Sequence, residues 1–130
     1  MIAIDANILV RYLVRDDPDQ ARRAKKLLQE TLSADEPGLV TIATLVELGW
    51  VLGKGYRIPA DEVRQIVTRL LDTPQIVFEQ SAVVQRALAL ELSDLADAII
   101  HEAGRESGCD KTLTFDRNFA RIDGVELLGA

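Results

Sequence analysis

Four acidic residues interrupt apolar stretches of the chain, and their carboxylates are suited to binding a metal cation. The four are Asp5, Glu47, Asp97 and Asp116. A lone carboxylate in apolar surroundings is costly unless it is paired, protonated or bound to a metal. Oxygen ligands of this kind are those that Mg²⁺ and similar hard cations prefer. The sequence therefore predicts that the four side chains together bind a divalent cation.

The composition is that of one globular domain covering residues 1–130. Of its residues, 48% are hydrophobic and 28% are charged, as in ordinary soluble proteins. We expect no membrane span, because no apolar run approaches the roughly 20 residues that one needs. The first residues read as a strand, with no basic segment or cleavage site before it, so we expect no signal peptide; the chain carries only one cysteine, Cys109. These features predict a cytoplasmic protein without an internal disulfide, in which Cys109 is a small packing residue.

The charge balance bears on whether the partner is a nucleic acid. The chain has 15 Lys and Arg against 21 Asp and Glu, a net charge of −6. Phosphate contacts normally supply much of the affinity for nucleic acid, so an acidic chain is not an obvious binder. Four of the negative charges would belong to the predicted site, however, and bound Mg²⁺ would cancel much of them. Charge alone therefore does not decide whether the protein binds nucleic acid.

Strand-like and helix-like stretches alternate along the chain. Strands are expected at Ile2–Asp5, Leu39–Ile42, Ile76–Phe78, Thr112–Phe115 and, at an edge, Val125–Leu128. Helices are expected at Asn7–Val14, Asp17–Leu28, Ala43–Gly53, Pro59–Leu71, Ser81–Leu92 and from Asp94 to about Ser107. This order predicts an α/β sandwich with a mostly parallel central sheet of about five strands, flanked by helices. Ligands of such folds bind beyond the carboxyl ends of strands, where Asp5 and Asp116 fall.

Three of the acids also have a structural explanation as helix caps. Asp5 and Asp116 could each cap the helix or turn that follows. Asp94 and Asp97 resemble a capping box, in which Asp94 caps the helix while Asp97 points into the site. For Glu47 the alternative is a solvated surface position, although its apolar neighbours predict a largely covered helix.

Several polar residues near the acids are candidates for supporting roles. Asn7 follows Asp5 and could fix the loop or orient a water, and Thr114 and Asn118 add polar groups around Asp116. His101 is expected to be a partly covered helix residue, because a metal-binding histidine would need a second His or Cys nearby.

The sequence resembles the PIN-domain family, and within it the VapC-type toxins of bacterial and archaeal toxin–antitoxin pairs. The matching stretches lie in the same order and at similar spacing over nearly the whole chain. They are Ile4–Asn7, Thr44–Glu47, Asp94–Ile100 and Leu113–Phe119. The resemblance implies a central parallel sheet flanked by helices and a ribonuclease that depends on Mg²⁺ or Mn²⁺. It implies that the acidic residues of the family's active site correspond to Asp5, Glu47, Asp97 and Asp116.

The resemblance also implies roles and partners. Asp5, Asp97 and Asp116 would bind the metal directly or through water, and Glu47 would bind metal or orient the attacking water. Arg11, Arg15 and Arg117 are weaker candidates for contacts with RNA phosphates, with a solvated surface charge as the alternative for each. Similar proteins form homodimers and bind a small cognate antitoxin, a segment of which enters or shields the active-site groove.

Other functions remain open from the residues alone. A haloacid-dehalogenase-type phosphatase would need Asp at the position of Asn7, and a phosphoacceptor receiver domain would not place Glu47 and Asp97 on helices. A different metal-dependent phosphoesterase, or a non-enzymatic binding module with the same fold, is the remaining alternative.

Overall fold

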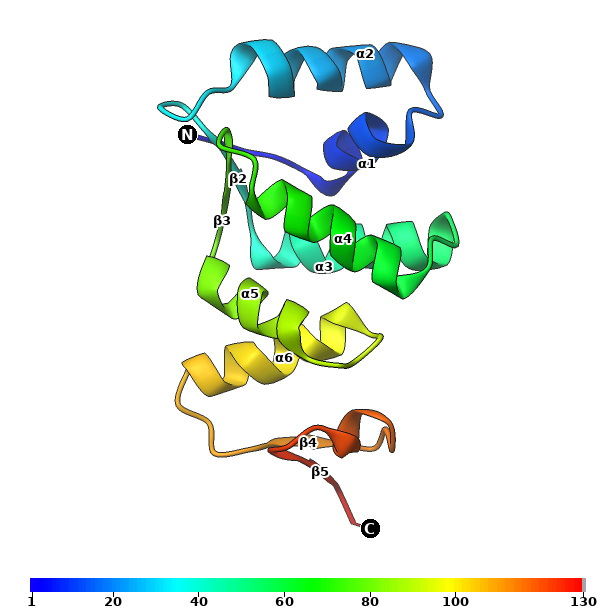
Figure 1. Ribbon diagram of the computed structural model, residues 1–130, viewed down its shortest axis with the longest axis vertical. Helices are drawn as coiled ribbons and strands as arrows, with labels where there is room; N and C mark the ends of the chain where they lie inside the picture. Colours follow the sequence, from blue (N-terminus) through cyan, green and yellow to red (C-terminus); the bar gives the residue numbers. More distant parts are fainter. Residues whose placement is uncertain (130) are drawn as a thin grey trace. The chain divides into compact units, whose positions relative to one another are not determined.

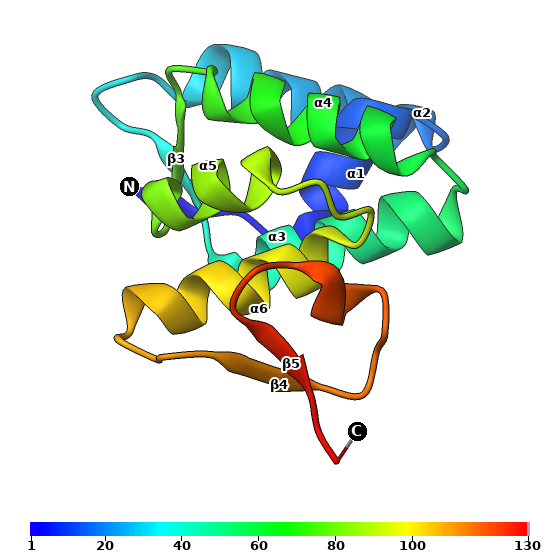
Figure 2. The same cartoon turned by 60° about the horizontal axis from the view of Figure 1, so that its bottom comes forward.

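The computed structural model describes residues 1–129, which form two compact units (Figures 1 and 2). The first unit spans Met1–Ser81 and the second begins at Ala82. Each unit contains both helices and parallel strands, so the predicted α/β class is confirmed. The same residues include no helix that is long and apolar enough to cross a membrane.

A three-stranded parallel sheet organises the first unit. Its strands are β1 (Ile2–Ala3), β2 (Gly38–Val40) and β3 (Ile76–Phe78), in the spatial order β1-β2-β3. In the register, Ile2 lies beside Gly38, which in turn lies beside Ile76. Because all three strands run in one direction, their carboxyl ends lie along one edge of the sheet, where parallel sheets commonly bind ligands.

Four helices accompany this sheet. They are α1 (Ala6–Val14), α2 (Pro18–Lys26), α3 (Ile42–Trp50) and α4 (Ala60–Leu71). Helix α1 packs against both α2 and α3, and Figure 1 shows it between them. Helices α2 and α3 continue into single π-helical turns at Leu27–Thr31 and Val51–Gly55. The buried side chains of this unit include Leu9, Val10, Val40, Leu45, Leu48, Leu52 and Val67.

The helices begin where short polar side chains accept backbone hydrogen bonds. The Gln20 amide donates to Asp17 Oδ1 at 3.1 Å, and Pro18 occupies the first turn, where its fixed φ and missing N–H are well tolerated. The Thr44 amide donates to Thr41 Oγ1 at 3.1 Å. These side chains satisfy N–H groups that have no partner within the helix, so the predicted helix start at Asp17 is confirmed.

The second unit contains two helices and a two-stranded parallel sheet. Its elements are α5 (Ser81–Ala89), α6 (Leu95–Glu106), β4 (Thr112–Thr114) and β5 (Val125–Leu127), with a 3₁₀ turn at Phe119–Arg121 between the strands. Strands β4 and β5 pair in parallel, with Thr112 beside Val125. The buried apolar side chains of this unit include Val83, Val84, Ala87, Ala98, Ile99, Phe119 and Val125.

Ion pairs join α5 to α6. The carboxylate of Glu102 is only 1% exposed, and it accepts a hydrogen bond from Arg86 Nε at 3.0 Å and one from Arg105 Nη1 at 3.2 Å. Arg86 Nη2 also donates to Glu106 at 2.6 Å. A buried carboxylate needs such partners, so this network fixes α6 beside α5.

The sequence-based boundaries were wrong in several places. Ile42 starts α3 instead of ending β2, because Thr41 caps the helix. Helix α5 ends at Ala89 instead of Leu92. Ile2 is 53% exposed, not buried, and Cys109 is exposed instead of packed. The five strands are confirmed, but in the described residues they form a three-stranded and a two-stranded sheet instead of one.

The close contact between β2 and Ile4 allows the packing of the first unit to be tested. A Cβ on Gly38 would meet the side chain of Ile4 and would lie 2.9 Å from Leu32 Cδ1. We expect Gly38→Ala to lower the free energy of unfolding by about 1–3 kcal/mol, as overpacked core positions do. Urea denaturation measures this change. Gly53→Ala is the matched control because a Cβ there meets nothing within 4 Å. Equal effects of both substitutions would contradict the packing argument.

Candidate functional site

The four predicted acids are more exposed than their apolar neighbours led us to expect. Asp5, Glu47 and Asp116 are exposed, and Asp97 is half-buried. The prediction that Glu47 lies on a largely covered part of its helix is wrong. Beside Asp5 and Glu47, some neighbouring residues bury their own side chains while the acids remain exposed. Leu45 and Leu48, for example, are both 0% exposed. Burial alone therefore does not force these carboxylates to share a cation.

Asp5 lies at the carboxyl end of β1 and caps α1. Its Oδ1 accepts a hydrogen bond from the Ala6 amide at 2.7 Å. Glu47 lies in the second turn of α3, the helix that packs against α1. The capping role that the sequence suggested for Asp5 is thus present, and its second carboxylate oxygen remains available for another partner.

The sequence reasoning missed an acidic residue at the end of β3. Glu79 Oε1 accepts a hydrogen bond from the Ile42 amide at the start of α3, at 2.9 Å. Asp5, Thr41 and Glu79 therefore follow β1, β2 and β3, and each accepts from the first turn of a helix. The signal in the sequence was the position of Glu79 directly after Ile76–Phe78, which matches the position of an acid or hydroxyl after the other two strands.

In the second unit, backbone amides hold two carboxylates at the ends of elements. The Asp97 amide donates to Asp94 Oδ1 at 3.1 Å, which confirms Asp94 as the N-cap of α6. Asp116 Oδ1 accepts from the amides of Asn118 at 2.8 Å and Phe119 at 3.1 Å. The Asp116 amide in turn donates to Thr114 Oγ1 at 3.0 Å. Thr114 and Asn118 thus shape the loop that presents Asp116.

Burial and two neighbouring carboxylates act on Asp97. Partial burial raises the pKa of Asp97 above its ordinary value, and the negative charges of Asp94 and Asp116 raise that pKa further. Like charges that are close together disfavour ionisation in this way. A cation near Asp97 would relieve both the repulsion and the loss of hydration.

The chemistry of these donors fits a hard divalent cation. The predicted set supplies only carboxylate, amide and hydroxyl oxygens, and Mg²⁺ and Mn²⁺ favour such ligands while keeping several waters. Across residues 1–129, no three His, Cys, Asp or Glu side chains are arranged to enclose an ion by themselves. The arrangement therefore fits a cation that is shared with water and a ligand better than one enclosed by protein alone.

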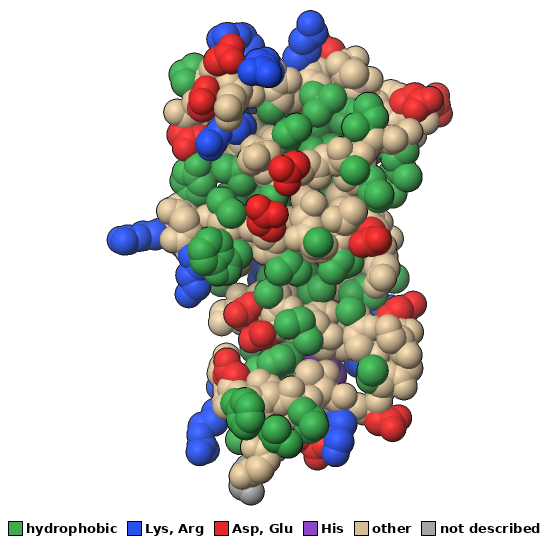
Figure 3. Space-filling model, turned by 180° about the vertical axis from the view of Figure 1, so that it is seen from behind, with side chains coloured by type: hydrophobic (Ala, Val, Ile, Leu, Met, Phe, Trp, Pro, Cys, Tyr) green, Lys and Arg blue, Asp and Glu red, His purple; other side chains and the backbone are tan. Residues whose placement is uncertain are grey.

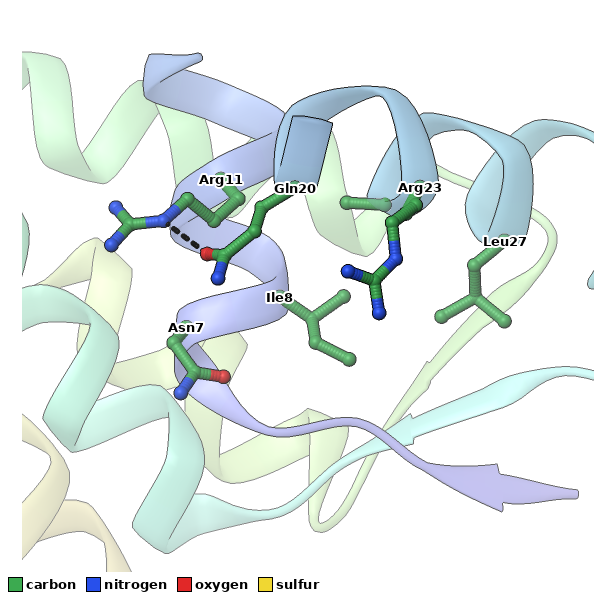
Figure 4. A pocket seen from close by; sticks show the side chains of 7 residues that line it. Asn7, Ile8, Arg11, Gln20, Arg23 and Leu27 are labelled. Atoms are coloured by element: carbon green, nitrogen blue, oxygen red, sulfur yellow. Dashed lines mark hydrogen bonds between the residues drawn. The ribbon is translucent and has the colours of Figure 1, made fainter. Parts of the chain in front are cut away.

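A pocket of about 250 Å³ lies between α1 and α2 (Figure 4). Its lining combines polar and apolar side chains, which are Asn7, Ile8, Arg11, Gln20, Arg23, Ala24 and Leu27. Arg11 Nε donates to Gln20 Oε1 at 2.7 Å across its rim. Two of the residues singled out in the sequence, Asn7 and Arg11, therefore line the same pocket.

The three candidate RNA-contact arginines differ in how they are held. Arg11 Nη1 lies 2.9 Å from Asp16 Oδ1 and donates to the Tyr56 hydroxyl at 3.1 Å. Tyr56 also donates to Asp16, and this bond, helped by Arg11, lowers the pKa of Asp16. Arg15 donates to the Tyr12 carbonyl at 3.2 Å, whereas Arg117 is exposed directly beside Asp116. Of the three, Arg11 is the one most occupied by protein partners.

On one face of the molecule, shown in Figure 3, basic side chains lie among acidic and hydrophobic ones. The Lys and Arg side chains on this face lie in small separate groups (Figure 3).

Comparison with known proteins identifies the family. The PIN domain family matches residues 2–125, which include all four predicted acids. The chain belongs to the PIN domain family. PIN domains are usually metal-dependent nucleases that bind RNA or other nucleic acid and generally use divalent metals such as Mg²⁺. No curated protein matched the chain.

The raised pKa of Asp97 predicts how stability depends on pH. Because the pKa is higher in the folded protein, ionised Asp97 destabilises the metal-free fold. The penalty is absent below the ordinary pKa of 3.8, grows as pH rises through the raised folded pKa, and is complete above it. We expect Asp97→Asn to increase the free energy of unfolding at pH 7 in EDTA. That increase should shrink towards pH 4, as measured by urea denaturation.

Asp123→Asn provides the matched control, because Asp123 is an exposed acid of the same unit. We expect its effect to stay within about 0.5 kcal/mol, as for most surface substitutions. A loss of stability in Asp97→Asn at pH 7 would contradict the electrostatic argument.

Proposed function

We propose that this protein is an endoribonuclease that hydrolyses RNA phosphodiester bonds with Mg²⁺ or Mn²⁺, using Asp5, Glu47, Asp97 and Asp116. We further propose that both compact units belong to one PIN domain covering residues 1–130. The observation that carries the proposal is the electrostatic coupling of Asp97 to Asp94 and Asp116, together with the family match. Mutually repelling carboxylates on a nuclease fold are suited to a divalent cation.

Each acid has a proposed role. Asp5, Asp97 and Asp116 hold the cation directly or through water, and Glu47 binds it or orients the attacking water. A bound divalent cation lowers the pKa of water and stabilises negative charge on a phosphate undergoing in-line attack. Asn7, Thr114 and Asn118 support the acids, and Asp94 keeps the first turn of α6 in place. The backbone hydrogen bonds of Asp94 and Asp116 fix these carboxylates before any ligand binds.

RNA binding has to overcome the net charge of −6. Arg117 is the best placed basic residue, because it is exposed and adjacent to Asp116. Arg15 is a second candidate. Arg11 is a weaker one because its guanidinium already contacts Asp16, Gln20 and Tyr56. Cation binding by the acids would reduce the repulsion between the protein and the RNA backbone.

We also propose that the protein acts as a VapC-type toxin that forms a homodimer and is inhibited by a small antitoxin. The support is the resemblance of its motifs to those toxins and the pocket between α1 and α2. This pocket contains both apolar side chains and two arginines, a lining that suits a peptide segment with aliphatic and acidic groups. The exposed lining residue Asn7 is two residues from Asp5, so a segment bound there would lie close to the start of α1.

A non-enzymatic binding module is the second candidate. The observation that favours it is that Asp5, Asp94 and Asp116 all cap backbone turns, a role that needs no metal. Cleavage assays separate the two candidates, because only the nuclease requires a cation.

We expect the purified protein to cut total cellular RNA into discrete fragments with Mg²⁺ or Mn²⁺ and to be inactive in EDTA. Asp97→Asn should lower the rate at least about a hundredfold, as the loss of a charge-stabilising group does. The measurement is fragment formation over time, with fragment ends mapped by sequencing.

Asp123→Asn again serves as the control, because it removes an exposed carboxylate without touching the predicted site. Cleavage that persists in EDTA, or equal rates for folded Asp97→Asn and the wild type, would contradict the proposal. A folded wild-type protein that cuts no RNA with either metal would favour the binding module.

Induced expression of the chain alone should arrest bacterial growth if the protein is a toxin. We expect cells that produce Asp97→Asn at the same level to grow at least tenfold faster during induction than cells that produce the wild type, because the growth arrest would depend on RNA cleavage. Optical density and RNA integrity measured in the same cultures test this. Arrest by both proteins would contradict a toxin that acts by RNA cleavage.

A further inference from the structure

His101 is buried between α6 and the strands of the second unit, with a partner for one ring nitrogen. It is 2% exposed, and its Nδ1 lies 2.8 Å from Thr112 Oγ1. Either the ring or the hydroxyl can donate in this bond, according to the tautomer. The bond connects the middle of α6 to the first residue of β4.

The ring is also confined by the backbone before β5. Gly124 has a φ of +88°, and a Cβ there would lie 3.1 Å from His101 Cε1. The carbonyl of Gly124 accepts a hydrogen bond from the Thr112 amide at 2.9 Å. Thr112 and Gly124 therefore form a slot of fixed shape around the imidazole. Few other side chains would match both the polar and the steric side of this slot.

The spacing of the residues connects this slot to the two acids. Asp97 precedes His101 by four residues, so both lie on one face of α6. Thr112 and Thr114 are two residues apart, so both lie on one face of β4. Thr114 Oγ1 accepts the hydrogen bond from the Asp116 amide. The bond between His101 and Thr112 therefore joins α6 to β4. It lies one helical turn from Asp97, and it lies on the strand that leads to Asp116.

This bond acts against a repulsive force. Asp97 on α6 and Asp116 just after β4 are carried by the two elements that this bond joins, and like charges held near each other repel. Without a bound cation, that repulsion favours separation of α6 from the loop after β4. A buried hydrogen bond between these same two elements opposes the separation.

We propose that His101 is a positioning residue that, through Thr112, sets the distance between Asp97 and Asp116 for binding of the divalent cation. This inference rests on the proposed function, since it concerns the same acids. Partners that orient metal-binding side chains typically change metal affinity or activity by 10- to 100-fold when they are lost.

The test compares Thr112→Val, which removes the hydroxyl at almost constant volume, with Thr112→Ser, which keeps it. Mn²⁺ affinity is measured from the electron paramagnetic resonance signal of free Mn²⁺, on proteins shown to be folded by circular dichroism. We expect Thr112→Val to weaken Mn²⁺ binding about tenfold and to lower kcat with little change in KM for RNA. Thr112→Ser should remain within about twofold of the wild type. His101→Leu should follow Thr112→Val and serves as a second variant if Thr112→Val does not fold.

Asp97→Asn in the same titration separates failure of this inference from failure of the proposed function. If Asp97→Asn weakens Mn²⁺ binding but folded Thr112→Val and His101→Leu do not, the positioning role of His101 is wrong while the metal site stands. If Asp97→Asn and the wild type bind Mn²⁺ equally, the proposed metal site itself fails. A loss of affinity in Thr112→Ser equal to that in Thr112→Val would also overturn the inference.

Discussion

Repulsion between neighbouring carboxylates is the constraint on which the candidate site depends. A protein that collects oxygen ligands for a divalent cation must hold their negative charges together before the cation arrives. In the second unit, partial burial raises the pKa of Asp97, and the negative charges of Asp94 and Asp116 raise it further, which reflects this cost. Backbone amides offset part of it, because Asp94 and Asp116 each accept hydrogen bonds at the start of a helix or turn. Helix N-termini also favour negative charge.

Capping and metal binding are therefore compatible roles for the same side chain. An ionised carboxylate has two oxygens with about four acceptor sites. Asp116 uses only Oδ1 for the amides of Asn118 and Phe119, and Asp5 likewise uses Oδ1 for Ala6. The hydrogen bonds fix where each carboxylate lies and leave its second oxygen available. A cap thus orients a ligand in advance, which reduces the ordering that metal binding would otherwise require.

Helix α6 is secured on two sides, and this matters because it carries Asp97. On one side, buried Glu102 pairs with Arg86 and Arg105. On another, His101 bonds to Thr112 of β4. Exposed ion pairs contribute little to stability, but a buried carboxylate that loses its partners is costly. The residues between Asp97 and Glu106 therefore hold the helix that presents the acid, although most of them do not approach the acid themselves.

The helices, the parallel strands and the caps at Asp17 and Asp94 could be predicted from the sequence because they follow from local rules. Periodicity and capping involve residues that are only a few positions apart. The division of the five strands into two sheets could not be predicted, because it depends on pairing between distant residues. The burial of His101 was underestimated for a similar reason, since its slot is formed by Thr112 and Gly124 far along the chain.

The prediction that the acids are covered failed for three of the four, whereas the prediction from their positions along the chain did not depend on burial. Apolar neighbours predicted covered carboxylates, yet Asp5, Glu47 and Asp116 are exposed. A site that acts on a polymer backbone has to admit a phosphate and its waters, so its ligands need access to solvent. Asp5 and Asp116 follow strands and Asp97 lies in the first turn of a helix, where the backbone can orient a carboxylate, whereas Glu47 lies within α3. Position at the end of an element therefore describes Asp5, Asp97 and Asp116 better than the hydrophobicity of their neighbours does, and Glu47 follows neither pattern.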